Sequence, residues 1–193
     1  FFDGTANWYR ENLMGEAGFT GNTASELGNC VHAAADMFAD TGDVDYEQID
    51  EYIDNLTGVD IDKDYIRTQY PQMVSVLLPF IERHQPAETE KFVFHEILPG
   101  IGAGGSIDAL QGHVVLNEDK WLIYLDDVTI MDWKTTSAKT APTKFSRNYW
   151  FQQMVYAWVL KQQGINVRQI KLVFVTSCEV NRFSEKTGKA LKD

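Results

Sequence analysis

Two different hydrophobic periods divide the chain near residue 90. Before that point apolar residues recur every three or four positions, which is typical of amphipathic helices. After it they alternate or form short runs rich in Val, Ile and Phe, which is typical of strands. The change of period predicts a mainly helical part, residues 1–90, followed by a part that contains the sheet, residues 91–193.

Three segments of the first part carry the helical pattern. Thr23 to Glu26 has the Thr-x-x-Glu form of a capping box and predicts a helix over 24–39. The acidic segment 46–56 predicts a short amphipathic helix. Two prolines interrupt the pattern over 62–84, and because proline removes a backbone donor, we expect two helical pieces there.

The second part predicts strands and one helix in a fixed order. Asp126 and Asp127 are expected to turn the chain between the third and fourth strands, and Gly164 to end the helix. We expect strands over 91–98, 106–116, 121–125, 128–134 and 170–176, with a helix over 145–163. No internal repeat or linker is evident, so a single α/β domain is predicted.

Composition limits the class of protein. The chain has 193 residues, 44% of them hydrophobic, which suffices for one core. No apolar run approaches the roughly 18 residues of a membrane span, so we expect a soluble, cytoplasmic protein. Cys30 and Cys178 stand far apart, which excludes a disulfide framework and a four-cysteine metal cluster. The chain begins with Phe1 and not Met, so residues before it are left open.

Charge is distributed unevenly along the chain. The net charge of −11 argues against a general nucleic-acid binder. Residues 1–130 hold 6 basic and 24 acidic side chains, whereas residues 131–193 hold 11 basic and 4 acidic. The positive end of the chain is also where the main candidate residues fall.

Two carboxylates and a lysine form the main chemical pattern. Asp132 and Lys134 stand two apart on a predicted strand, so they project from the same face, while Trp133 points into the core. The Trp133 carbonyl then lies between them, where Mg²⁺ would accept an oxygen ligand. Asp108 adds a second carboxylate on an earlier strand, after Gly105.

Each of these short patterns is weak when taken alone. Gly42-x-x-Asp45 repeats the first spacing and Glu118-x-Lys120 the second, but both lie in predicted turns. Asp108 and Asp132 are instead on strands of one meander, in the order that the chemistry needs. Without a further pattern they would equally be hydrogen-bonded residues at strand ends.

The complete set resembles the RecB-like branch of the PD-(D/E)XK nucleases. Gly105-x-x-Asp108, Asp132-x-Lys134 and Gln152-x-x-x-Tyr156 stand in that family's order over residues 28–176. The resemblance implies a restriction-endonuclease-like α/β core, with a central mixed sheet flanked by helices. It also implies a metal-dependent DNA exonuclease of phage or mobile-element type, acting in recombination or repair.

The resemblance also implies roles for individual residues. One or two Mg²⁺ or Mn²⁺ ions would be bound by Asp108, Asp132, the Trp133 carbonyl and His32, a histidine that many members carry on an earlier helix. Lys134 would orient the attacking water and stabilise developing charge. The chain lacks the four cysteines of the iron-sulfur relatives, so no iron-sulfur cluster is expected.

Other residues have two readings that the sequence leaves open. Glu96 is interpreted either as a residue that serves the metals or as an exposed charge on a strand. Gln152 and Tyr156 either line the site or help to pack their helix against the sheet. Phosphate contacts compete with a solvated basic loop at Lys139, Lys144 and Arg147.

Two other functional classes stay open beside the nuclease. One is a non-catalytic DNA-binding or assembly module with a nuclease-like fold. The other is a metal-independent hydrolase that uses two carboxylates as acid and base. A recombination or single-strand-binding partner protein and an oligomer are also left open, and no membrane is expected as a partner.

Overall fold

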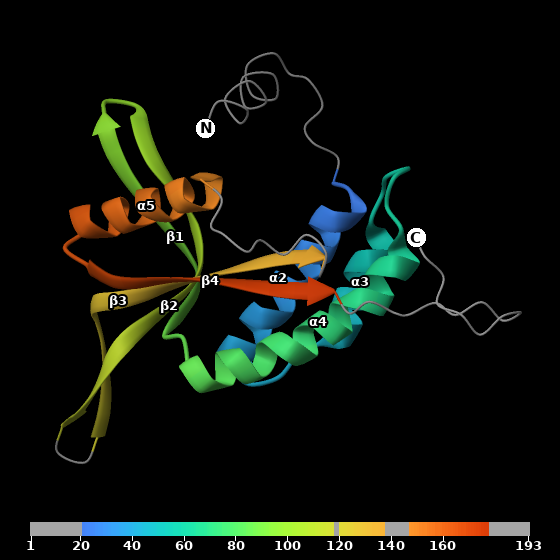
Figure 1. The fold of residues 1–193 in the computed structure, drawn as a ribbon, viewed down its shortest axis with the longest axis horizontal. Coiled ribbons are helices and arrows are strands. Elements are labelled where there is room, and N and C mark those ends of the chain that lie inside the picture. Colours follow the sequence, from blue (N-terminus) through green and yellow to red (C-terminus); the bar gives the residue numbers. More distant parts are fainter. Residues whose placement is uncertain (1–20, 118–119, 138–146, 178–193) are drawn as a thin grey trace, which may run out of the picture.

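The computed structural model describes residues 21–117, 120–137 and 147–177 (Figure 1). Within these residues helices come first, then strands, a helix and a last strand, as the hydrophobic period predicted, but with three helices in place of four helical pieces and three strands in place of four. The elements are α2 (Thr23–Thr41), α3 (Tyr46–Asn55), α4 (Lys63–His84), β1 (Glu88–Leu98), β2 (Ile101–Asn117), β3 (Lys120–Ser137), α5 (Arg147–Gln162) and β4 (Asn166–Ser177). No described helix is long and apolar enough to span a membrane.

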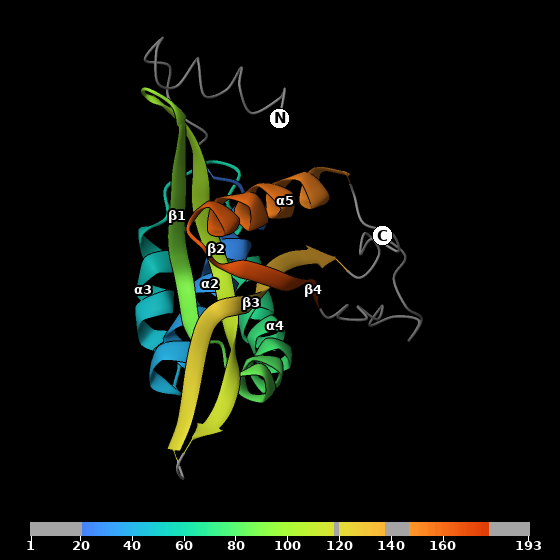
Figure 2. The ribbon, with the colours of Figure 1, turned by 90° about the vertical axis from the view of Figure 1, so that its left-hand side faces the viewer.

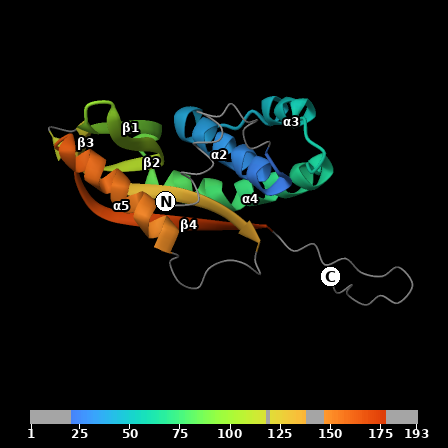
Figure 3. The ribbon, with the colours of Figure 1, turned by 90° about the horizontal axis from the view of Figure 1, so that it is seen from above.

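The strands form one mixed sheet in the order β1-β2-β3-β4. β1 and β3 both run antiparallel to β2, whereas β4 runs parallel to β3. Viewed from above, α2 and α3 lie on one side of the sheet and α5 on the other (Figure 3). The predicted fold class, an α/β core with a mixed sheet flanked by helices, is therefore confirmed.

Each face of the sheet is covered by its own hydrophobic core. On β3, Met131 and Trp133 pack into the core shared with α2, α3 and α4. Val128 and Ile130 pack into the core beneath α5. Side chains alternate between the faces of a strand, so one short apolar run supplies both cores.

The sheet forks where β2 and β3 separate. Their ladder ends at the pair Ala109 and Met131. Beyond it, residues 101–107 of β2 pair only with β1, and residues 132–137 of β3 pair only with β4. Figure 1 shows the two halves diverging, the β1–β2 hairpin to the upper left and the ends of β3 and β4 to the right. Backbone groups of β3 that face the fork must find partners outside the ladder.

The cap of α2 differs from the predicted one. Asn22 is the N-cap, its side chain accepts the N–H of Ser25 at 2.9 Å, and the Ser25 hydroxyl accepts the Asn22 N–H. The predicted Thr23-x-x-Glu26 box was wrong by one position. Thr23 uses its hydroxyl to donate to the Asp60 carbonyl at 2.8 Å, which ties α2 to the segment before α4.

α4 is one continuous helix, so the prediction of two pieces was wrong. Pro71 is partly exposed and Pro79 exposed, so carbonyls that lose a helical partner can reach water. Each proline costs about 3 kcal/mol in a helix interior, whereas each large apolar side chain buried contributes about 1.5–3 kcal/mol. The buried apolar residues of α4 are Ile66, Tyr70, Met73, Val74, Leu77 and Ile81.

β3 is also continuous, so the predicted turn at Asp126 and Asp127 was wrong. Between two regular stretches of the β2–β3 ladder, only Gly112 of β2 lies opposite residues 125–128 of β3. A Cβ on Gly112 would lie 2.5 Å from the Tyr124 carbonyl oxygen, so the bulge requires glycine there. Asp127 already pairs with Asn166 of β4, and this keeps the acidic pair within the strand.

Candidate functional site

The fork in the sheet brings Asp108 of β2 against the backbone of β3. Its Oδ2 accepts a hydrogen bond from the Trp133 N–H at 2.6 Å. This N–H has no ladder partner on the side of β2, because the β2–β3 pairing has already ended. The Trp133 side chain is buried on the opposite side, edge-on to Phe80, as the sequence predicted for a core residue.

His32 of α2 contacts the other backbone group of the same residue. Its Nε2 lies 3.0 Å from the Trp133 carbonyl oxygen. A carbonyl can only accept, so Nε2 carries the proton, and in the neutral ring Nδ1 keeps its lone pair. Nδ1 faces Oδ1 of Asp108 at 3.7 Å and Oε1 of Glu90 at 3.9 Å. A metal-binding histidine is commonly oriented in this way by a carbonyl.

The close approach of α2 to the fork depends on a small residue. Gly28 lies one turn before His32, and a Cβ on it would come within 3.2 Å of the Thr135 hydroxyl. Glycine at this position therefore lets α2 pass close to Thr135 of β3.

Glu90 completes a set of three residues whose ligand atoms lie within 4.8 Å of one another, together with His32 and Asp108. The β1–β2 register places it there, because the flanking pairs are Thr89 with Ala109 and Lys91 with Ile107. The φ angle of Glu90 is +45°, an uncommon value for a residue other than glycine. Sequence reasoning missed this residue, because only the register shows that it faces Asp108.

Glu96 was the predicted acidic neighbour, and the structure does not bring it to this cluster. It is paired with Gly102, six residues along β2 from Asp108. Its carboxylate is exposed and accepts the Gly100 N–H at 2.7 Å in the β1–β2 turn. The hydrogen bond within the turn therefore explains the position of the Glu96 carboxylate without a bound ligand.

Asp132 and Lys134 lie together on the next stretch of β3. Lys134 Nζ is 3.0 Å from Oδ1 and 2.9 Å from Oδ2 of Asp132. Gln153 of α5 is fully buried, and its Nε2 donates to the same Oδ1 at 2.8 Å. Oδ2 is buried without a hydrogen bond, although Lys134 is close. A buried carboxylate oxygen in that state is a position where a cation fits.

Gln153 was not singled out from the sequence, where Gln152 was the predicted site-lining residue. Gln152 instead donates from Nε2 to the Tyr156 hydroxyl at 3.1 Å. Tyr156 is buried, and its hydroxyl lies where a Cβ on Gly105 would be only 2.9 Å away. The predicted residues Gln152 and Tyr156 thus contact each other, but it is Gln153 that contacts the carboxylate of Asp132.

Electrostatics distinguish Asp108 from an ordinary surface carboxylate. Burial raises the pKa of Asp108 from 3.8 to about 6, and the negative charge of Asp132 also raises it. His32, the Trp133 N–H and Lys134 oppose this rise. Two buried carboxylates separated by one backbone segment create a negative site that a divalent cation would neutralise.

The ligand chemistry of the cluster fits a small divalent cation. It offers carboxylate oxygens from two strands and an imidazole nitrogen with a free lone pair, ligands that Mg²⁺ and Mn²⁺ accept. The Trp133 carbonyl, predicted as a further ligand, is the acceptor of the His32 hydrogen bond. Its second lone pair leaves room for one more partner.

The predicted basic residues contribute no described side chain. Lys139 and Lys144 lie outside the described residues, and Arg147 begins α5 with a side chain that is not described. Lys134 is a predicted basic residue whose side chain is described, and its Nζ lies beside Asp132 and 5.8 Å from the centre of the Tyr149 ring.

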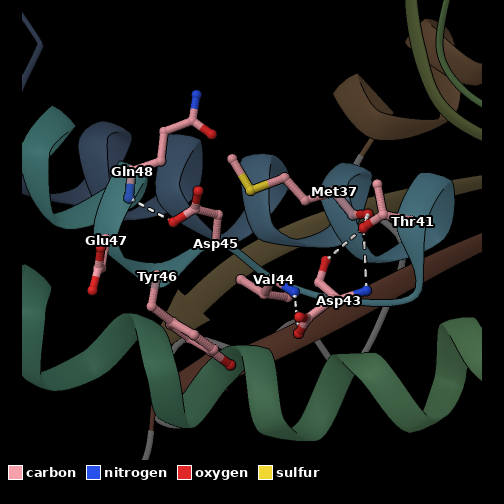
Figure 4. Close-up of a pocket in the computed structure, with 8 residues that line it drawn as sticks. All are labelled: Met37, Thr41, Asp43, Val44, Asp45, Tyr46, Glu47 and Gln48. Atoms are coloured by element: carbon pink, nitrogen blue, oxygen red, sulfur yellow. Dashed lines mark hydrogen bonds between the residues drawn. The ribbon is translucent and has the colours of Figure 1, made fainter.

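A hollow of about 610 Å³ lies away from this cluster, where α2 turns into α3 (Figure 4). Its lining includes Met37, Asp43 and Tyr46, and none of the predicted site residues. The carboxylate of Asp43 accepts the Val44 N–H, and that of Asp45 accepts the Gln48 N–H. Its polar groups serve the turn and the α3 cap, so this hollow does not compete with the fork as a site.

Comparison with known proteins gives one family. A family model described as the PD-(D/E)XK nuclease superfamily matches residues 5–190. No curated protein matches the chain. No solved structure matches it either.

Proposed function

The chain belongs to the PD-(D/E)XK nuclease superfamily, and from this premise we propose that it is a metal-dependent deoxyribonuclease. The observation that carries the proposal is the arrangement at the fork, where Trp133 separates two acidic groups. His32, Glu90 and Asp108 converge beside the Trp133 backbone, and Asp132 pairs with Lys134 at the two flanking positions of β3. We assign the catalytic site to this fork, within a single nuclease domain.

The residues divide into those that hold a cation and those that support them. Asp108, Glu90 and Nδ1 of His32 are ligands from the cluster, and Oδ2 of Asp132, which Lys134 Nζ approaches at 2.9 Å, is a further ligand. A divalent cation there, Mg²⁺ or Mn²⁺, supplies positive charge at the scissile phosphate and lowers the pKa of water. The Trp133 backbone keeps His32 and Asp108 oriented, because it bonds to both.

Lys134 is the residue of this set that can act on the attacking water and the phosphate. Its ammonium group is held by Asp132 and remains partly exposed, so it can donate to a water or to a phosphate oxygen. There it orients the water and stabilises the negative charge that develops on phosphorus-bound oxygen. Gln153 donates a second hydrogen bond to Asp132, so Lys134 is not the only residue that orients this carboxylate.

The finer assignment is an exonuclease of the RecB-like branch, of phage or mobile-element type, that acts on DNA in the cytoplasm. The motif order Gly105-x-x-Asp108, Asp132-x-Lys134 and Gln152-x-x-x-Tyr156 supports it. The imidazole ligand favours Mn²⁺ over Mg²⁺, since the order of divalent affinities and the nitrogen donor act in the same direction.

The test is cleavage of end-labelled linear DNA and closed circular DNA with Mg²⁺, with Mn²⁺ and with chelator. The proteins compared are the wild type, Lys134→Met and the control Lys161→Met, which removes an exposed charge from the end of α5. We expect loss of linear DNA that requires metal, is abolished in Lys134→Met and is unchanged in Lys161→Met. A spared circle identifies an exonuclease.

The opposite results select the other two classes. Metal binding without cleavage of any substrate would favour the non-catalytic DNA-binding or assembly module. Full activity in chelator would favour acid–base hydrolysis by the two carboxylates. Circular dichroism of each variant verifies that loss of activity is not loss of fold.

A further inference from the structure

Two phenylalanines are exposed on the edge strand of the sheet. Phe92 and Phe94 of β1 are 69% and 51% exposed, whereas Val93 between them is 1% exposed and packs beneath α5. Strand alternation therefore puts both rings on the face that α5 does not cover. Figure 2 shows the outer end of the β1–β2 hairpin extending beyond the helices on either side.

Two glycines of β2 leave no side chain on the part of the sheet beside Phe94. Phe94 pairs with Gly104, and the next residue on the same face of β2 is Gly102. A Cβ on Gly102 would lie 2.2 Å from Cζ of Phe94, and one on Gly104 would lie 3.1 Å from its Cδ2. The ring thus rests across the two glycine backbones, so one face of the ring packs on β2 and the other is left for a ligand.

The rings are in line with the proposed metal site. Phe92 and Phe94 are alternate residues of one strand, so they are roughly 7 Å apart along β1, and Glu90, with its φ of +45°, stands two residues before Phe92. The carboxylate of Glu90 belongs to the cluster with His32 and Asp108. A polymer bound along this face would therefore pass both rings and reach the cluster.

We propose that Phe92 and Phe94 form a stacking platform for unpaired bases of the DNA strand whose phosphate enters the fork. This inference rests on the proposed nuclease function and names the form of its substrate, a single strand or a frayed end. Bases expose their faces only when unpaired, and stacking on aromatic side chains holds single strands without regard to sequence.

Charge favours stacking over a grip on phosphates at this face. Residues 1–130 carry 24 acidic and 6 basic side chains. Lys91, the basic residue on β1, alternates with Phe92 and so lies on the opposite face, and it forms an ion pair with Glu88. Contacts with bases give an acidic surface a way to hold DNA that does not depend on neutralising the backbone.

The test measures oligonucleotide binding separately from cleavage. The probes are fluorescein-labelled oligo(dT) and an abasic strand of the same length. Their binding is measured by fluorescence anisotropy, with Ca²⁺ in place of Mg²⁺. The variants are Phe92→Ala, Phe94→Ala and the pair, with Ile101→Ala as a control that removes an exposed aliphatic side chain from the same hairpin. Phe92→Trp keeps an aromatic ring, and Phe94→Leu replaces Phe94→Ala if that variant does not fold.

The expected result is a loss of affinity for oligo(dT) on the order of tenfold for each ring removed. Affinity for the abasic strand stays unchanged, as does the affinity of Ile101→Ala and Phe92→Trp for oligo(dT). Equal losses on both probes, or no loss on oligo(dT), overturn the inference. A change in molar mass by light scattering without a change in affinity also overturns it, because the face is then a contact between copies through edge strand β1.

Failure of the nuclease proposal has a different outcome. If oligonucleotide binding depends on the two rings but the wild type cleaves no DNA with any metal, the stacking platform is supported and the nuclease proposal is rejected. Cleavage that needs Lys134 while binding ignores the rings removes only the platform.

Discussion

Replacing Asp108 by asparagine is expected to stabilise the metal-free protein at neutral pH. The carboxylate is buried, with its side chain 11% exposed, and burial raises its pKa to about 6 from an ordinary 3.8. The side-chain amide of Asp108→Asn would still present an oxygen to the Trp133 N–H, which donates to the carboxylate in the wild type. The amide carries no charge, so the cost of burying a charge beside Asp132 would disappear.

The sign and size follow from linkage. Between pH 3.8 and 6 the unfolded chain has already lost the proton that folded Asp108 retains, so wild-type stability falls as pH rises. Below pH 3.8 this penalty is absent, and above pH 6 it is complete. One pKa unit corresponds to about 1.36 kcal/mol, so the full penalty is on the order of 3 kcal/mol.

The assay is urea unfolding of the wild type and of Asp108→Asn at pH 5 and pH 7.5, in chelator. The stability difference between them should approach about 3 kcal/mol at pH 7.5 and fall to roughly half of that at pH 5. Saturating Mn²⁺ should then stabilise the wild type and leave Asp108→Asn unchanged. A variant that is less stable than the wild type, or a difference independent of pH, would refute the reasoning.

Three further results are expected. Gln153→Leu should change the free energy of unfolding by only about 1 kcal/mol, because loss of the hydrogen bond to Asp132 is offset by removal of a buried unpaired oxygen. Gln153→Glu should unfold the protein. Equal stability of the two variants in urea would contradict this. Cys30, whose pKa burial raises to about 11, should resist iodoacetamide at pH 8 in a Cys178→Ser background until urea unfolds the chain, whereas labelling of the folded protein would contradict its burial. Pro79→Ala should raise the thermal midpoint, with a gain of about 1–2 kcal/mol from the restored bond to the Ser75 carbonyl; a lower midpoint would show that the proline suits the helix.

Features that depend on neighbouring residues could be predicted from the sequence. Alternation along one strand was enough to put Asp132 with Lys134 and to turn Trp133 into the core. The change of hydrophobic period at residue 90 located the start of the sheet to within a few residues. The order of elements followed, because each helix or strand displays its own period.

Features that depend on pairing across the fold could not be predicted in this way. Glu90 and Glu96 look alike in the sequence, and only the register with β2 brings the first to Asp108. Gln152 and Gln153 differ by one step of α5, so the docking angle of the helix decides which one reaches Asp132. Those contacts are set by packing between distant segments.

Local conformational preference and tertiary packing oppose each other at two places where the prediction was wrong. The two prolines of α4 oppose a helix locally, but the apolar face of that helix is buried along its whole length. The acidic pair Asp126 and Asp127 favours a turn locally, but pairing of β3 with β4 keeps it in a strand. In both places the larger buried surface or the longer ladder prevails.

The most direct test of the metal site at the fork is a calorimetric titration of Mn²⁺ into the wild type, Glu90→Gln and Glu96→Gln. These two variants make the same chemical change on the same strand, but only Glu90 lies with His32 and Asp108. We predict that Glu90→Gln weakens Mn²⁺ binding by roughly tenfold or more, while Glu96→Gln binds as the wild type does. Equal affinity in Glu90→Gln and the wild type, or a loss confined to Glu96→Gln, would contradict a metal site at the fork.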